Sequence, residues 1–178
     1  MKRRSFLMTI VAFFGYVFGR TGTAATQSQG MMAGGMCSMM SKENMQGPMR
    51  TGMELFQRHE LIHRQVTELP NGVHVVTTSN DPATASIIKK HVVEMYARLD
   101  KNQPFPYPVS KSVPKMFANP TGYQRKLEVL PNGIAITETS ADHEMVAVIR
   151  AHAQELNGFV KEGMPAMMRE MMQNGNGM

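Results

Sequence analysis

The stretch Leu69-Pro70-Asn71-Gly72 decides the fold, because it recurs 61 positions later as Leu130-Pro131-Asn132-Gly133. Aligned at this shift without a gap, the 36 positions that begin at Leu69 contain 11 identities, among them His91 with His152. Self-similarity at a fixed period is the signature of a repeated supersecondary unit. The chain therefore holds two copies of one unit.

Each copy is expected to contain a hairpin followed by a helix. Runs of β-type residues at 65–69 and 73–78 flank Pro-Asn-Gly, a hairpin signal in which glycine is expected to take the positive φ of the turn. Ser79 or Asp81 then caps a helix that runs to about Leu99, and the matching helix spans 142–161. A preceding helix is expected over 52–64, with a broken counterpart around 115–119.

The predicted fold class is α+β. Two α-β-β-α units, 54–104 and 115–163, are expected to join their hairpins into a four-stranded antiparallel sheet with helices on one face. The result would be a single pseudo-twofold domain over 54–163. A swapped homodimer that shares the sheet is the alternative.

Residues 1–25 are typical of an export signal. Lys2, Arg3 and Arg4 precede an apolar run at 6–19, which is too short to span a bilayer, and small residues follow at 23–25. The arginine pair resembles a twin-arginine signal, and a general secretory signal is the alternative. Either signal predicts a periplasmic protein without an integral membrane segment in its mature form. These residues carry four of the 19 basic side chains and no acidic one, so the formal charge of +5 gives no support for nucleic-acid binding.

The repeat carries a resemblance. LPNG, Thr-Ser-x-Asp and a histidine on the following helix resemble a set of small exported bacterial proteins of undefined function, over about 55–164. This resemblance implies the fold and export, and it implies no activity. Phosphate-loop, GxSxG and HExxH signatures do not occur in the sequence, so enzyme activity is uncertain and not expected.

Two histidines occupy the same place in both units. His91 shares a helical stripe with Met95 and with an isoleucine, and His152 lies on the equivalent stripe, so both imidazoles should point toward the apolar side. Equivalent positions of two related units can meet, which makes the pair a candidate metal or haem site. The alternative is a structural role, with both rings hydrogen-bonded to backbone or to Glu94 and Glu155.

Two further histidines extend this candidate site. His59 and His63 form a His-x3-His pair on the helix expected over 52–64, a spacing that suits metal chelation. His59, His91 and His152 are expected to form a buried site for copper, zinc, nickel or haem iron. If the group is haem, Met95 is a further candidate axial ligand.

Methionine is concentrated on both flanks of the duplicated core. Of the 19 Met in the chain, eight lie in a Gly- and Met-rich segment at 26–53 that is expected to be disordered, and six lie in a Met-rich tail at 164–178. The one Cys lies in the first of these segments. Thioethers favour Cu(I), and the Met-x2-3-Met spacing resembles exported copper-handling proteins. The candidate Cu(I) ligands are Met36, Cys37, Met39, Met40, Met164, Met167, Met168 and Met171. An amphipathic segment that packs on a partner protein is the alternative.

The hypothesis from the sequence is therefore a periplasmic metal-binding protein, with copper tolerance or delivery as its role and Cu(I) or Cu(II) as its cofactor. A haem-binding or electron-transfer protein that uses the same histidines is the first alternative. A non-catalytic interaction module is the second. A periplasmic copper or redox protein is the expected partner.

Overall fold

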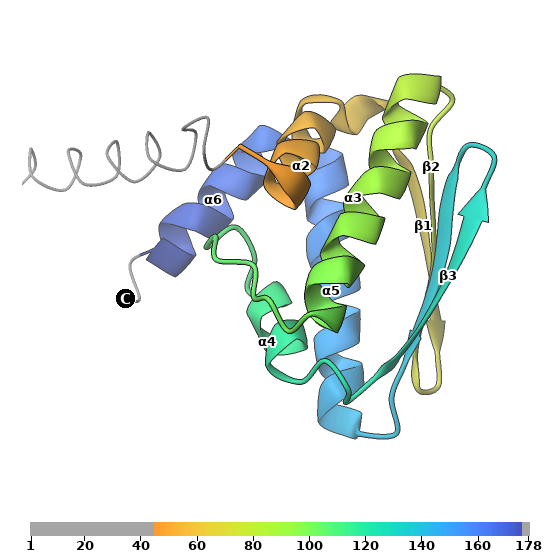
Figure 1. Ribbon diagram of the computed structural model, residues 1–178, viewed down its shortest axis with the longest axis vertical. Helices are drawn as coiled ribbons and strands as arrows, with labels where there is room; N and C mark the ends of the chain where they lie inside the picture. The colour runs from red at the N-terminus through yellow and green to blue at the C-terminus, as the bar shows by residue number, and fades with distance from the viewer. Residues whose placement is uncertain (1–44, 176–178) are drawn as a thin grey trace, which may run out of the picture.

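The computed structural model describes residues 45–175 and shows one sheet with the helices on one side of it (Figure 1). This arrangement confirms the predicted α+β class and four-stranded antiparallel sheet. The elements, in chain order, are α2 (Gly47–Gln57), the 3₁₀ turn η1 (His59–Leu61), β1 (His63–Leu69), β2 (Gly72–Thr78), α3 (Pro82–Asp100), α4 (Val113–Ala118), β3 (Gln124–Leu130), β4 (Gly133–Thr139), α5 (His143–Glu162) and α6 (Met164–Gly175).

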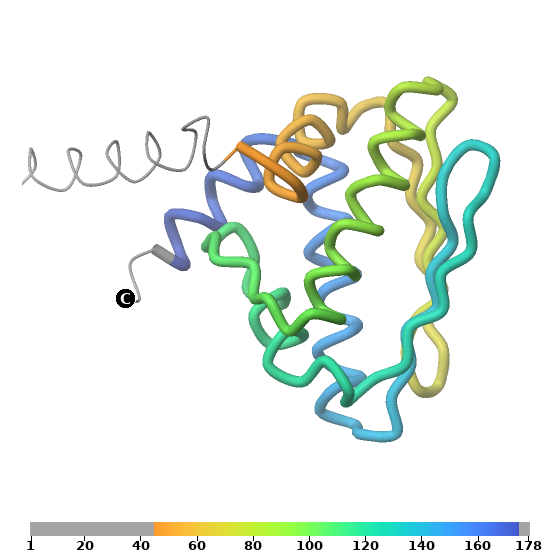
Figure 2. Tube along the Cα trace, viewed as in Figure 1, coloured from red at the N-terminus to blue at the C-terminus, as the bar shows by residue number. Residues whose placement is uncertain are grey.

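The sheet has the order β1-β2-β4-β3, so the two hairpins join through their second strands. Strands β2 and β4 are antiparallel, with Gly72 opposite Thr139 and Thr78 opposite Gly133. The turn of one hairpin therefore lies at the opposite end of the sheet from the turn of the other, as the yellow and cyan turns show (Figure 2).

The two turn glycines are needed for a reason other than the expected one. Neither Gly72 nor Gly133 has a positive φ, so the prediction of left-handed backbone at these positions is wrong. A Cβ on Gly72 would lie 1.9 Å from the carbonyl oxygen of Glu138, and one on Gly133 would lie 2.1 Å from that of Thr77. Glycine is required because the neighbouring strand of the other hairpin passes too close for any side chain.

Matching hydrogen bonds tie each hairpin to the turn of the other. The Ser79 amide donates to the Asn132 carbonyl at 2.9 Å, and the Ser140 amide donates to the Asn71 carbonyl at 2.9 Å. The residues that follow begin the two long helices. Asp81 caps α3 by accepting from the Thr84 amide, and Asp142 is the N-cap of α5.

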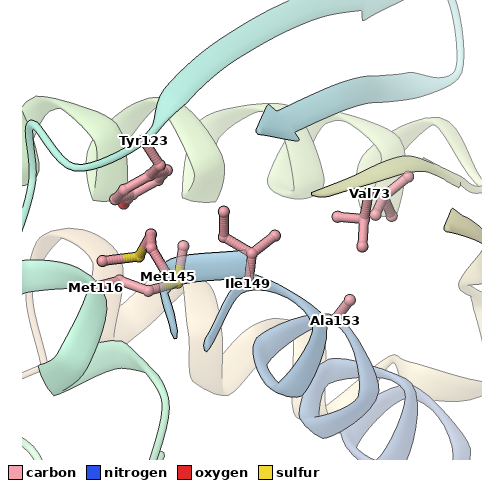
Figure 3. Packing of buried hydrophobic residues seen from close by; sticks show 7 residues of the cluster. Val73, Met116, Tyr123, Met145, Ile149 and Ala153 are labelled. Carbon is pink, nitrogen blue, oxygen red and sulfur yellow. The ribbon is translucent and has the colours of Figure 1, made fainter. Parts of the chain in front are cut away.

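The two units share one hydrophobic core, because the inner strand of each unit packs against the long helix of the other unit. Val73 and Val75 of β2 pack against Met145, Ile149 and Ala153 of α5 (Figure 3). A second cluster joins α3 to β4 through Ile88 and Ile134. Burial of apolar surface thus holds the two units together as one body.

The structure differs from the sequence expectations at both ends of the repeat. The helix expected over 52–64 is α2 at Gly47–Gln57 followed by η1, and residue 63 already belongs to β1. The segment expected to be disordered up to residue 53 therefore ends in helix. After residue 163 the chain forms α6, with Met167 fully buried. None of the helices in residues 45–175 is both long and apolar enough to cross a membrane.

Candidate functional site

A cavity of about 220 Å³ lies between the helices and the inner strands. A cavity that holds one water needs a volume of only roughly 10–15 Å³, so this space can hold a much larger group. Its walls are mostly apolar and come from α2, α3, α5, the two inner strands and the segment before α4. His91 from α3 and His152 from α5 both line it.

His91 is held by a hydroxyl and a carboxylate. The Thr51 hydroxyl of α2 lies 3.0 Å from His91 Nδ1 and 2.9 Å from Glu94 Oε2. The carbonyls of Gly47 and Pro48 also lie within reach of this hydroxyl, at 3.3 and 3.4 Å, and like the carboxylate they can only accept its single proton. The hydroxyl oxygen therefore accepts from the Nδ1–H of the ring. The chain of bonds therefore runs from imidazole to hydroxyl to carboxylate. Gly52 lies against the same ring, where a Cβ would come 3.2 Å from Cε1 of His91.

His152 has the same arrangement in the second unit. The Ser112 hydroxyl lies 2.9 Å from His152 Nδ1 and donates to Glu155 Oε2. Glu155 is further held by the Ser110 hydroxyl and by the Lys111 amide, the latter at 2.7 Å from Oε1. Thr51 and Ser112 are 61 positions apart, as are the two histidines and the two glutamates.

Both imidazoles are neutral at neutral pH. Burial lowers the pKa of His91 to about 4, and the carbonyl of Pro48 acts in the opposite direction. Burial likewise lowers the pKa of His152 to about 4, with the Arg64 charge adding to the effect and Glu155 opposing it. Because Nδ1 carries the proton in each ring, Nε2 has a free lone pair. Among residues 45–175, the side-chain hydrogen bonds of both rings go through Nδ1, and the His91 ring also has a hydrogen bond to the Pro48 carbonyl.

A polar group lies on the sheet side of the cavity. Arg64 of β1 donates to the Thr77 hydroxyl at 2.9 Å and to Asn157 Oδ1 at 3.1 Å. Glu138 of β4, which is 6% exposed, accepts from the Tyr96 hydroxyl at 3.1 Å. Burial raises the pKa of Glu138, and the bond from Tyr96 together with the arginine charges opposes this.

The remaining histidines do not join the pair as expected. His59 also lines the cavity, but its Nδ1 lies 3.0 Å from the Val160 carbonyl oxygen. His63 is exposed at the start of β1, so the predicted helical His-x3-His face is wrong. Among residues 45–175, no three His, Cys, Asp or Glu side chains gather as a metal site would require. The expected trio of His59, His91 and His152 is therefore not formed.

The candidate sulfur ligands are divided between three places. Met95 lines the cavity with the two histidines. Met164, Met167, Met168 and Met171 pack in a cluster between α2 and α6. The other candidate ligands, Met36, Cys37, Met39 and Met40, lie outside the described residues, as does the predicted export signal.

Thr51 and Ser112 are the residues that the sequence did not single out. They lie upstream of the identical positions, one in a Met-rich segment and the other in a Pro-rich one. The signal that points to them is their match at the repeat shift, since both carry a hydroxyl 40 positions before the histidine of their unit.

Comparisons of the chain with protein families, with curated proteins and with solved structures gave no match.

Proposed function

We propose that this protein binds haem, with His91 and His152 as the two axial ligands of the iron. The observation that carries the proposal is that two neutral imidazoles, each held through Nδ1, line one apolar cavity. A porphyrin supplies four nitrogen ligands itself, so two histidines complete the coordination of its iron. Apolar walls suit its ring system.

The support behind each ring fits a ligand role. Histidines that bind metals usually donate their other ring N–H to an acceptor, which fixes the ring and makes Nε2 more basic. Thr51 with Glu94 and Ser112 with Glu155 supply such an acceptor to each histidine. The same arrangement argues against nucleophilic catalysis, because each hydroxyl gives its proton to a carboxylate and not to the imidazole.

Electron transfer is the role that follows. An iron held by two histidines has no open position for oxygen or substrate, which favours electron transfer over oxygen chemistry. The export signal in residues 1–25 supports a periplasmic place for this role.

A bare copper or zinc ion is supported less well at these histidines. Zinc sites in proteins usually have four ligands, and His91 and His152 gather no third His, Cys, Asp or Glu in the described part of the chain. Among residues 45–175, no hydrogen bond joins either imidazole to a sulfur of the four methionines that line the cavity, namely Met49, Met53, Met95 and Met116. A cavity of about 220 Å³ is also far larger than one ion needs.

Haemin titration of the full chain tests the proposal. The wild type should bind one haem with a Soret band. The variants His91→Ala and His152→Ala should each lose affinity at least tenfold. His74→Ala is the matched control, because His74 also bonds a hydroxyl through Nδ1, that of Thr137 at 3.0 Å, but does not line the cavity.

The alternative functions give different results in the same samples. Copper in the purified protein without a Soret band would support a copper site at the histidines. Protein that takes up neither haem nor copper would favour an interaction module. Equal haem binding by wild type and both cavity variants would refute His91 and His152 as ligands.

A further inference from the structure

The two methionine-rich flanks meet in the folded structure. Helix α2 contributes Met49 and Met53 and helix α6 contributes Met167 to one buried cluster, although more than 100 positions separate the two segments. Four partly buried methionines pack against them, namely Met45, Met164, Met168 and Met171. We call these seven residues the methionine cluster. In Figure 1 the two helices lie beside each other, away from the sheet.

Methionine is concentrated at this interface and not throughout the core. The cluster that joins α3 to β4 contains isoleucine, leucine and valine and no methionine. The cluster under α5 contains only two methionines, Met116 and Met145. The cluster also contains Val109, Phe56, Phe105 and Tyr107, the residue types that normally serve packing. Six thioethers on α2 and α6, with Met45 just before α2, are more than such packing requires.

We propose that the methionine cluster is a binding site for Cu(I), formed by thioether sulfurs from both α2 and α6. Neutral, soft thioethers favour Cu(I) and its analogue Ag(I) over Zn(II) or Mg(II). Met45, Met164, Met168 and Met171 are only partly buried, so an ion can reach the sulfurs from solvent. Met49 and Met53 also line the cavity of the haem proposal, whereas Met45 and the α6 methionines do not, so the sulfurs that solvent can reach are separate from the histidine site.

A titration with Cu(I) under anaerobic conditions, against a competing Cu(I) chelator, tests this site in the full chain. In the cluster variant, Met45, Met164, Met168 and Met171 are replaced by leucine, which keeps volume and apolar character but removes sulfur. Its affinity for one Cu(I) should fall at least tenfold. Met116→Leu with Met145→Leu is the matched control, because these methionines lie in the cluster under α5. This variant should bind Cu(I) as the wild type does.

Two further variants separate the other candidate ligands. One replaces Met36, Met39 and Met40 by leucine and Cys37 by serine, and the other is His91→Ala with His152→Ala. If the cluster variant binds Cu(I) like the wild type while either of these loses an ion, the proposal is overturned. Zn(II) should not displace the cluster-bound ion.

Methyl NMR of the wild type gives a readout that does not depend on the folding of a variant. On addition of one equivalent of Ag(I), the ε-methyl signals of Met164, Met168 and Met171 should shift, while those of Met116 and Met145 stay in place. Shifts confined to methionines outside the methionine cluster would contradict the site.

Discussion

His91 and His152 lie 61 positions apart in the chain, yet both rings line one cavity. Each ring donates a hydrogen bond from Nδ1 to a hydroxyl that in turn donates to a glutamate. The repeated sequence pattern thus accompanies a histidine and a glutamate on each of α3 and α5, with a hydroxyl supplied from α2 or from the residue before α4. Because both hydroxyls donate to carboxylates, both rings keep the tautomer whose lone pair is on Nε2. A pair of equivalent ligands is the consequence.

The hydroxyls should control haem affinity without contacting haem. Thr51→Val and Ser112→Ala each remove the acceptor of one Nδ1–H. Loss of such a support typically weakens metal binding about 10–100-fold, and we expect a fall in this range in haemin titrations. Thr137→Val is the matched control, since it removes a hydroxyl–histidine bond outside the cavity. If all three variants bind haem equally, the hydroxyls do not orient the ligands.

Gly52 should be needed for the position of His91. A Cβ here would lie 3.2 Å from Cε1 of the ring, next to the nitrogen that we propose as the iron ligand, so Gly52→Ala should displace the ring and lower haem affinity several-fold. Gly158→Ala in α5 is the control, because a Cβ there meets nothing within 4 Å. Removing a helical glycine should stabilise that variant by roughly 0.5–1 kcal/mol. Haem affinities unchanged in both variants would exclude crowding of the ring.

Acid should destabilise the haem-free protein through the two histidines. Their folded pKa of about 4 lies below the ordinary value of 6.5, so between these pH values the unfolded chain binds more protons. Stability should therefore be full above pH 6.5 and fall as the pH drops to 4, by on the order of 3 kcal/mol for each histidine. Glu138, with its raised pKa, acts in the opposite direction.

Urea unfolding at a series of pH values measures this effect. The double variant His91→Gln, His152→Gln should lose most of the dependence between pH 6.5 and 4. A wild-type free energy of unfolding that stays constant over this range would show that the rings are not buried as neutral groups.

The close approach of β2 and β4 predicts a strong effect of the turn glycines. Gly72→Ala and Gly133→Ala would each place a Cβ about 2 Å from a carbonyl oxygen of the neighbouring strand. Since backbone cannot move aside as a side chain can, each should destabilise the protein by roughly 3 kcal/mol or more in urea unfolding. Normal stability in either variant would mean that the strands can separate locally without loss of pairing.

The hairpins and long helices were predictable because their signals are local. Pro-Asn-Gly between β-type runs and the capping aspartates Asp81 and Asp142 act within a few residues of the chain. The boundary after α2 was not predictable in this way. The apolar spacing up to Ile62 fits a helix, but pairing of His63 with Thr78 extends β1 to that point.

The tertiary features of the site had weaker signals. The equivalence of His91 and His152 suggested a shared location, and both line the cavity. The role of Thr51 depends on α2 packing across α3, a contact between distant segments. The meeting of the methionine-rich flanks likewise depends on the path of the chain between them. Composition alone suggested disordered segments, because composition does not show which helices pack against each other.

The optical and electron paramagnetic resonance spectra of the full chain loaded with one equivalent of haem test the central claim most directly. Two histidines on one iron predict a low-spin ferric spectrum and sharp visible bands in the reduced protein. His91→Ala and His152→Ala should each convert the ferric iron to high spin, and His74→Ala should not. A high-spin spectrum in the wild type, or a low-spin spectrum unchanged in both cavity variants, would contradict ligation by His91 and His152.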